Sequence, residues 1–378
     1  MKLINPFFLL LTLLMLDISI HILIPGTYGK ISTLSIFIVF LYVFSFFIGF
    51  YILCGFFPKL NLIRKTAIKS KVRPWVLLIF LIFGLFYYAY AYISVADFNF
   101  AQYRQFIFDA YSEKNSTYWL IRFFSLYAFV ASIFLLLFKD EKKINIIFFF
   151  VVIIISIIST GRNYLVIYFL FLFISVLNSR RPIINILISI FLFLTISGIF
   201  IFIFNKSTGG LISGTVGSVL HYFAMPLHGL SVMLSSDEYY GSIMLLSPGI
   251  LDALGVDYSP VPQMPYTPRP HVTNVYTLFY PIYYDLGLSG IVSFGLIYGF
   301  VHGIIYYYAK RGGAFALYIY GISLYPLVMT VFTDVYLSSI GLWVAALIPW
   351  ALVKVKPNPS PSPNLKRWPL NRIDREGF

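Results

Sequence analysis

The chain has 378 residues, of which 60% are hydrophobic and 11% charged, and its mean hydropathy is +0.86. Soluble domains carry about 25% charged residues and cannot bury so much apolar surface, so the composition excludes an ordinary soluble protein. The formal charge of +13 does not indicate a nucleic-acid partner, because the basic residues flank hydrophobic segments instead of lining one soluble face.

Hydrophobic segments of about 20 residues, the length that crosses a bilayer, recur along the chain. In chain order they occupy residues 3–24, 31–57, 75–95, 118–138, 145–160, 163–178, 183–204, 287–309, 314–334 and 337–353. The sequence therefore predicts an all-α polytopic membrane protein with about ten transmembrane helices.

The connections between these spans alternate in charge. Basic residues gather between the second and third spans, between the fourth and fifth, after the sixth and the eighth, and in the tail. The positive-inside rule makes that side cytoplasmic, with both termini inside. We expect one transmembrane domain at 1–353, with a large outer loop at 205–286, and a disordered basic cytoplasmic tail at 354–378.

Motifs for nucleotide and metal chemistry are absent from the sequence. There is no Walker A loop, no Gly-x-Gly-x-x-Gly after a strand, no His-Glu-x-x-His and no Gly-x-Ser-x-Gly. We therefore expect no cofactor and no metal, and any activated group must arrive with the substrate.

Few basic residues remain on the predicted outer side, and two of them flank apolar spans. Arg162 follows Gly161 in a tight turn, where an unpaired guanidinium is costly unless it reaches water or an anion. The planar fork of arginine matches phosphate oxygens, so Arg162 is either an anion ligand or a snorkelling anchor at the interface. Arg122, just inside the fourth span, has the same two interpretations.

A second candidate region precedes the eighth span. Prolines at 262, 265, 268 and 270 exclude a continuous helix and hold this segment extended. The polar and aromatic residues that it presents are Arg269, His271, Asn274, Tyr276, Tyr280 and Asp285. They supply a cation, a proton carrier, hydrogen-bonding groups and aromatic faces, which suit a sugar attached to phosphate. The alternative is an interfacial belt of tyrosine and proline that only re-enters the membrane.

Other ionisable residues have simpler interpretations. His221 and His228 belong to a stretch with apolar residues at helical spacing, which favours a helix on the membrane surface with both histidines solvated. Asp17 and His21 are four residues apart in the first span and share one helix face, so we expect a structural pair.

Three motifs resemble one known family. They are "STGRNYLVIYFLFLF" at 159–173, "HYFAMPLHGLSVML" at 221–234 and "TNVYTLFYPIYYDLGLSGIVSFGLIYGFVHG" at 273–303. In these motifs, in the order of spans and in the large outer loop, the chain resembles the Wzy-type O-antigen polymerases, also called oligosaccharide repeat unit polymerases.

The resemblance implies a GT-C-like glycosyltransferase of the bacterial inner membrane, with the 205–286 loop in the periplasm. Such enzymes join undecaprenyl-diphosphate-linked oligosaccharide repeat units, sometimes with a chain-length regulator protein as partner. The likeness extends to Arg162 and, after the loop, to Asn274, Thr277, Pro281, Asp285 and Gly287.

Site roles follow from the same resemblance. Arg162, Arg269 and Arg122 would bind the diphosphate, with Asn274 and Tyr280 near the substrate. His271, His221 and Asp285 compete for the role of general base, and Asp285 has a helix-start cap as its alternative role. An O-antigen ligase, or a flippase or transporter of the lipid-linked oligosaccharide, is the alternative function.

Overall fold

The computed structural model describes part of the chain. The described residues are 3–24, 30–53, 55, 74–95, 215–235, 276–310, 314–333, 335 and 336, with single positions between 102 and 154 and between 343 and 347. The regular elements within them are α1 (Pro6–Leu23), α2 (Thr33–Phe47), the π-helical η1 (Ile48–Leu53), α4 (Pro74–Tyr90), the π-helical η2 (Ala91–Val95), α10 (Thr215–Ser235), α12 (Phe279–Lys310) and α13 (Ala314–Met329). Throughout these residues the protein is helical and no strand occurs.

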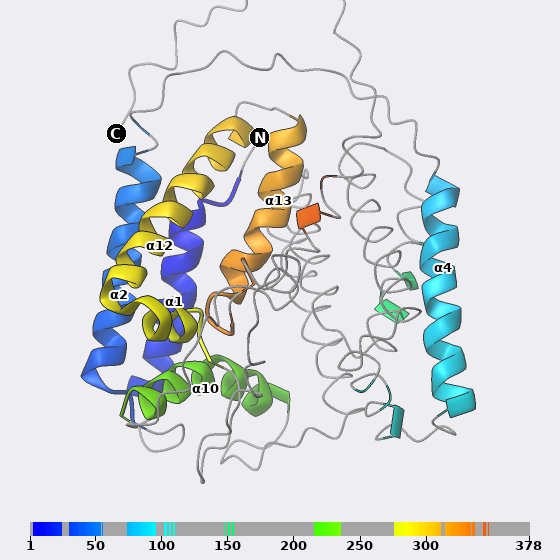
Figure 1. The fold of residues 1–378 in the computed structure, drawn as a ribbon, viewed down its shortest axis with the longest axis horizontal. Coiled ribbons are helices and arrows are strands. Elements are labelled where there is room, and N and C mark those ends of the chain that lie inside the picture. Colours follow the sequence, from blue (N-terminus) through cyan, green and yellow to red (C-terminus); the bar gives the residue numbers. More distant parts are fainter. Residues whose placement is uncertain are drawn as a thin grey trace, which may run out of the picture.

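Four helices form a bundle, and a fifth lies across one end of it. Figure 1 shows α1, α2, α12 and α13 side by side, with α10 crossing beneath them where α1 ends and α12 begins. This end of the bundle, which holds the α1–α2 connection, α10 and the start of α12, is called the α10 end below. The Tyr320 hydroxyl of α13 donates to the Ile4 carbonyl at the opposite end, so the first helix is held by the last described one.

The helices begin where local side chains satisfy the backbone. The Asn5 carboxamide oxygen accepts from the Phe7 N–H at 3.0 Å before α1, and Pro6 occupies the first turn, where its missing N–H costs nothing. The Ser32 hydroxyl accepts from the Ser35 N–H at 3.1 Å before α2. These caps explain why both spans start within a few residues of the predicted positions.

Length and apolar surface indicate a helical membrane protein. Three described helices, Pro6–Leu23, Thr33–Ile52 and Phe279–Lys310, are long and apolar enough to cross a bilayer. Large apolar side chains point outward from them, including Phe8 and Phe44, which are 58% and 61% exposed. An outward face of this kind suits lipid and not water.

Glycines bring α12 and the α2–η1 segment into close contact. A Cβ added at Gly299 would collide with the carbonyl oxygen of Phe46, and one added at Gly49 would collide with that of Leu296. Each helix therefore places a glycine against the backbone of the other, which is how helices associate tightly in a membrane.

Several predicted spans agree with described helices. The spans at 3–24, 31–57 and 314–334 contain α1, α2 with η1, and α13, and the span at 75–95 matches α4 with η2 except that α4 begins one residue earlier, at Pro74. The spans at 118–138, 163–178 and 183–204 lie outside the described residues, and those at 145–160 and 337–353 are described only at single positions. The count of ten, the outer loop as a whole, the boundary at residue 353 and the tail at 354–378 stay predictions.

The eighth span is longer than predicted. It was expected at 287–309, but α12 begins at Phe279, inside the stretch assigned to the outer loop. Pro281 lies in the first turn of this helix, where a missing N–H is tolerated. Gly287, with φ 61° and ψ −153°, then divides α12 into a short segment and a long one.

Candidate functional site

The α10 end holds those sequence-predicted site residues that the structure describes. Tyr280 and Asp285 lie in the short first segment of α12, and His221 lies in α10, although only its backbone is described. The other predicted site residues lie outside the described residues: Arg122, Arg162, Arg269, His271 and Asn274.

Three tyrosine rings lie in contact at the start of α12. The ring of Tyr280 lies 4.9 Å from that of Tyr276 and 4.5 Å from that of Tyr284, measured between centroids. Tyr280 is fully buried, so its ring is part of the packed core in this structure. The Tyr284 hydroxyl donates to the Met233 carbonyl of α10 at 2.8 Å, which joins the two elements.

Asp285 lies two residues before the kink of α12 at Gly287. Its side chain is half-buried, and one of its carboxylate oxygens is inaccessible to solvent. The non-helical residue at the start of the long segment is Gly287, so Gly287 and not Asp285 takes the position of an N-cap there. The role of Asp285 as a general base remains a prediction.

The backbone also joins the start of α12 to the end of α13. The Leu278 N–H donates to the Thr330 carbonyl at 2.9 Å. Thr277, one of the residues carried by the family resemblance, is 1% exposed beside this bond. The described part of this motif therefore begins with buried residues, Tyr276, Thr277 and Leu278.

His228 is buried, which contradicts the expectation that it is solvated. It is 9% exposed, and its Nδ1 lies 3.4 Å from the Lys30 carbonyl oxygen in the connection between α1 and α2. The neighbouring Ser231 hydroxyl lies 2.8 Å from the Ser35 hydroxyl and accepts from the Ser32 N–H at 3.1 Å. This half of α10 is packed into the bundle because it meets residues almost 200 positions earlier in the chain, which no local pattern reveals.

Asp17 and His21 form the expected pair, with an additional partner. The Nε2 atom of His21 lies 3.9 Å from the Asp17 Oδ1 atom and 2.8 Å from the Ala224 carbonyl oxygen of α10. Asp17 is fully buried and His21 is 7% exposed. The pair therefore links α1 to α10, a contact that the sequence analysis missed.

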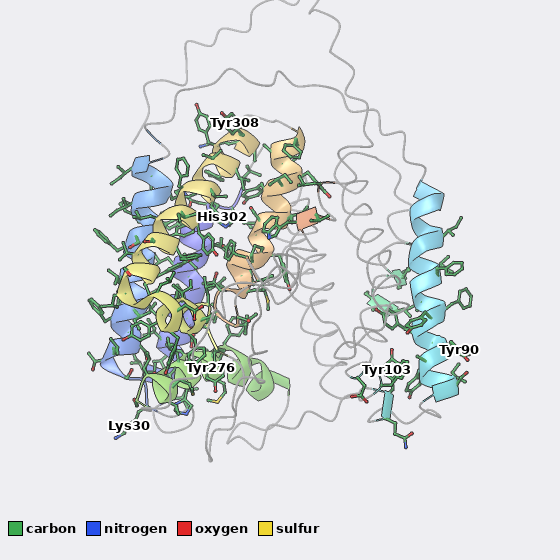
Figure 2. All side chains as sticks on the ribbon, viewed as in Figure 1. Lys30, Tyr90, Tyr103, Tyr276, His302 and Tyr308 are labelled. Atoms are coloured by element: carbon green, nitrogen blue, oxygen red, sulfur yellow. The ribbon has the colours of Figure 1, made fainter. Side chains whose placement is uncertain are left out.

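A third buried histidine, His302, lies at mid-height in the bundle (Figure 2). His302 of α12 is 1% exposed, and its Nε2 lies 2.9 Å from the Tyr336 hydroxyl. Tyr336 stacks on Tyr298 with ring centroids 3.9 Å apart, and its carbonyl accepts from the Trp343 indole N–H at 3.0 Å. This cluster fastens α12 to the residues that follow α13.

The described residues contain no group of three or more histidine, cysteine, aspartate or glutamate side chains that could hold a metal ion. Comparisons of the chain with family models, with curated proteins and with solved structures gave no match.

Proposed function

We propose that the protein is a membrane glycosyltransferase that joins oligosaccharide repeat units carried on undecaprenyl diphosphate, forming O-antigen or a related surface polysaccharide. The reaction takes place on the periplasmic face of the bacterial inner membrane. A helical membrane body without a nucleotide motif supports this proposal, because a lipid-diphosphate donor arrives already activated.

A contact between two of the motifs, from Tyr284 to Met233, also supports the proposal. The motifs at 221–234 and 273–303 are separated by the proline-rich segment, yet Tyr284 of the second donates to the Met233 carbonyl of the first at 2.8 Å. Two of the three motifs that resemble the polymerase family thus meet at one end of the bundle. Residues that cooperate in one site are expected to meet in this way.

In the proposed reaction, a hydroxyl of the acceptor repeat unit attacks the anomeric carbon of the donor sugar. The bond from that carbon to the diphosphate oxygen breaks, and the lipid diphosphate leaves with the electron pair. A general base takes the hydroxyl proton, and the candidates are His271, His221 and Asp285. Arg162 and Arg269 stabilise the charge on the leaving diphosphate.

Deletion of the gene tests the reaction class. A surface glycan with a single repeat unit on its core is expected in the deletion strain, whereas bare core would indicate a ligase or a flippase. Unchanged long chains in that strain would refute the proposal.

Arg162→Ala tests the diphosphate ligand. Loss of one well-placed charge stabiliser lowers a rate by about 100- to 1,000-fold, so long chains should disappear from the gel while the protein remains in the membrane. Lys30→Ala is the matched control, because Lys30 is an exposed cation at the α10 end with no assigned role. Full-length polymer from Arg162→Ala would remove the arginine from the site.

A further inference from the structure

Polar contacts hold α10 from three neighbouring elements. Tyr284 of α12 donates to the Met233 carbonyl, Ser231 meets Ser35 of α2, and His21 of α1 reaches the Ala224 carbonyl. Because α10 crosses the end of the bundle, its apolar side chains alone would let it slide over the ends of the other helices (Figure 1). Hydrogen bonds to specific carbonyls fix its position along its own axis.

The contact of His21 differs from the others in its chemistry. A carbonyl oxygen only accepts hydrogen bonds, so the Nε2 atom of His21 must carry the proton that it donates to Ala224 at 2.8 Å. Asp17, fully buried, places Oδ1 3.9 Å from the same nitrogen. Neither carboxylate oxygen of Asp17 has a hydrogen-bond donor among the described residues, and the 3.9 Å separation is too long for a hydrogen bond to His21.

The contact of His21 lies close to a proline within α10. Pro226 lies inside the helix, two residues after Ala224, and supplies no N–H to the preceding turn. The part of α10 before this proline is therefore less firmly held by the helix itself. This N-terminal part contains His221, which lies about one turn before Ala224, the residue whose carbonyl accepts from His21. A bond at Ala224 restrains the N-terminal part where the helix is weakest.

We propose that His21, which lies beside Asp17, is a positioning residue that sets the placement of the N-terminal part of α10 and of His221 within it. The role in catalysis rests on the proposed function, with the α10 end as part of the transferase site. His21 does not touch the substrate in this proposal. It acts through the backbone of α10.

Cross-linking measures the placement directly. Ile20, Ala224 and Met225 form one small apolar cluster between α1 and α10, so cysteines introduced by Ile20→Cys and Met225→Cys report their contact. The background is Cys54→Ser, since Cys54 is the single cysteine of the chain. In membranes, His21→Leu should lower the cross-linking yield about three- to tenfold, the range expected for loss of one hydrogen bond. His21→Gln keeps a donor and should retain the yield.

Polymer length measures the consequence for the reaction. His21→Leu should give short chains and His21→Gln long ones, at equal protein levels. Ser231→Ala is the control, because it removes a buried contact of α10 on the other side of Pro226 and should leave chain length unchanged. A general loss of stability would shorten the chains in both His21→Leu and Ser231→Ala.

Three outcomes would overturn the positioning role: full-length polymer from His21→Leu, failure of His21→Gln to restore length, or equal shortening by Ser231→Ala. Failure of the proposed function is a separate result. It is seen as unchanged polymer in the deletion strain, and it removes the catalytic role, whereas the cross-linking yields still decide whether His21 places α10.

Discussion

Gly287 is the residue on which the shape of α12 depends. Its φ of 61° and ψ of −153° lie in a region that glycine adopts readily and other residues do not. An added Cβ would meet no atom within 4 Å, so the requirement comes from the backbone and not from crowding. The kink directs the tyrosine-lined first segment toward α10 while the long segment follows the bundle.

Gly287→Ala should therefore destabilise the protein by about 1–3 kcal/mol. Thermal unfolding of the purified protein in detergent measures the effect. Gly55→Ala is the matched control, because Gly55 also has no atom within 4 Å of an added Cβ but lacks the left-handed φ. Equal melting temperatures for the two variants would contradict this explanation of the kink.

The burial of single polar residues was the property least accessible from the sequence. Asp17 and His21 were predicted as a pair because their spacing is local, and the 3.9 Å separation confirms that they meet. His228 was predicted to be solvated, but it is buried. The prediction failed because its contact, Lys30, is 198 positions away in the sequence. His302 gave no local signal of its contact with Tyr336.

At the scale of elements, the apolar spans were the most predictable feature. The spans that contain α1 and α2 were found because crossing a bilayer requires a long run of apolar residues. Such a run can be recognised in the local sequence alone. The start of α12 was missed because the prolines before it favour an extended chain, whereas Pro281 occupies a tolerated position in the first turn. The α10 helix was expected from its periodicity, but its attachment to α1 and α2 was not.

Close packing of α12 on α2 also has a signal in the sequence. Gly295, Gly299 and Gly303 are spaced by four residues and share one face of α12. Two of them lie against the backbone or side chains of α2, at Phe46 and at Ser45. The spacing predicts a contact face, although it does not reveal which helix will cover it.

Gly299→Ala separates two opposed effects of the same substitution. Alanine favours a helix over glycine by about 1 kcal/mol, whereas overpacking costs about 1–3 kcal/mol, and here the obstacle is the Phe46 carbonyl rather than a flexible side chain. We expect a lower melting temperature in detergent. Ile297→Ala, on the exposed face of the same helix, should change it little. A stabilised Gly299→Ala variant would show that the helices are not in close contact.

At the scale of the whole molecule, the two ends of the bundle differ in their contents. Lys30 lies at the α10 end and Tyr308, near the end of α12, lies at the other (Figure 2). The charge pattern predicted that Lys30 and Lys310 face opposite sides of the membrane, and the direction of α12 agrees with that separation. Which end faces the cytoplasm stays a prediction, as do the positions of the arginines proposed to bind diphosphate.

Cysteine labelling in intact cells tests the orientation. In the Cys54→Ser background, Lys30→Cys and Arg162→Cys should react with a membrane-impermeant maleimide, and Lys310→Cys should react only after the membrane is opened. Arg162→Cys that reacts only in opened membranes would place this residue on the wrong side for the proposed reaction. Reaction of Lys310→Cys in intact cells would show that the topology is the reverse of the predicted one.

The hydrogen bond from Tyr320 to the Ile4 carbonyl has a consequence for biosynthesis. A ribosome delivers α1 and α2 to the membrane first, yet their partners α12 and α13 emerge only near the end of translation. Until then α1 and α2 lie among lipids without the two helices that pack on them, and Gly49 lacks its contact with the Leu296 backbone. Nascent chains interrupted before α12 should therefore be recognised by membrane proteases as unfinished, so that only completed chains accumulate.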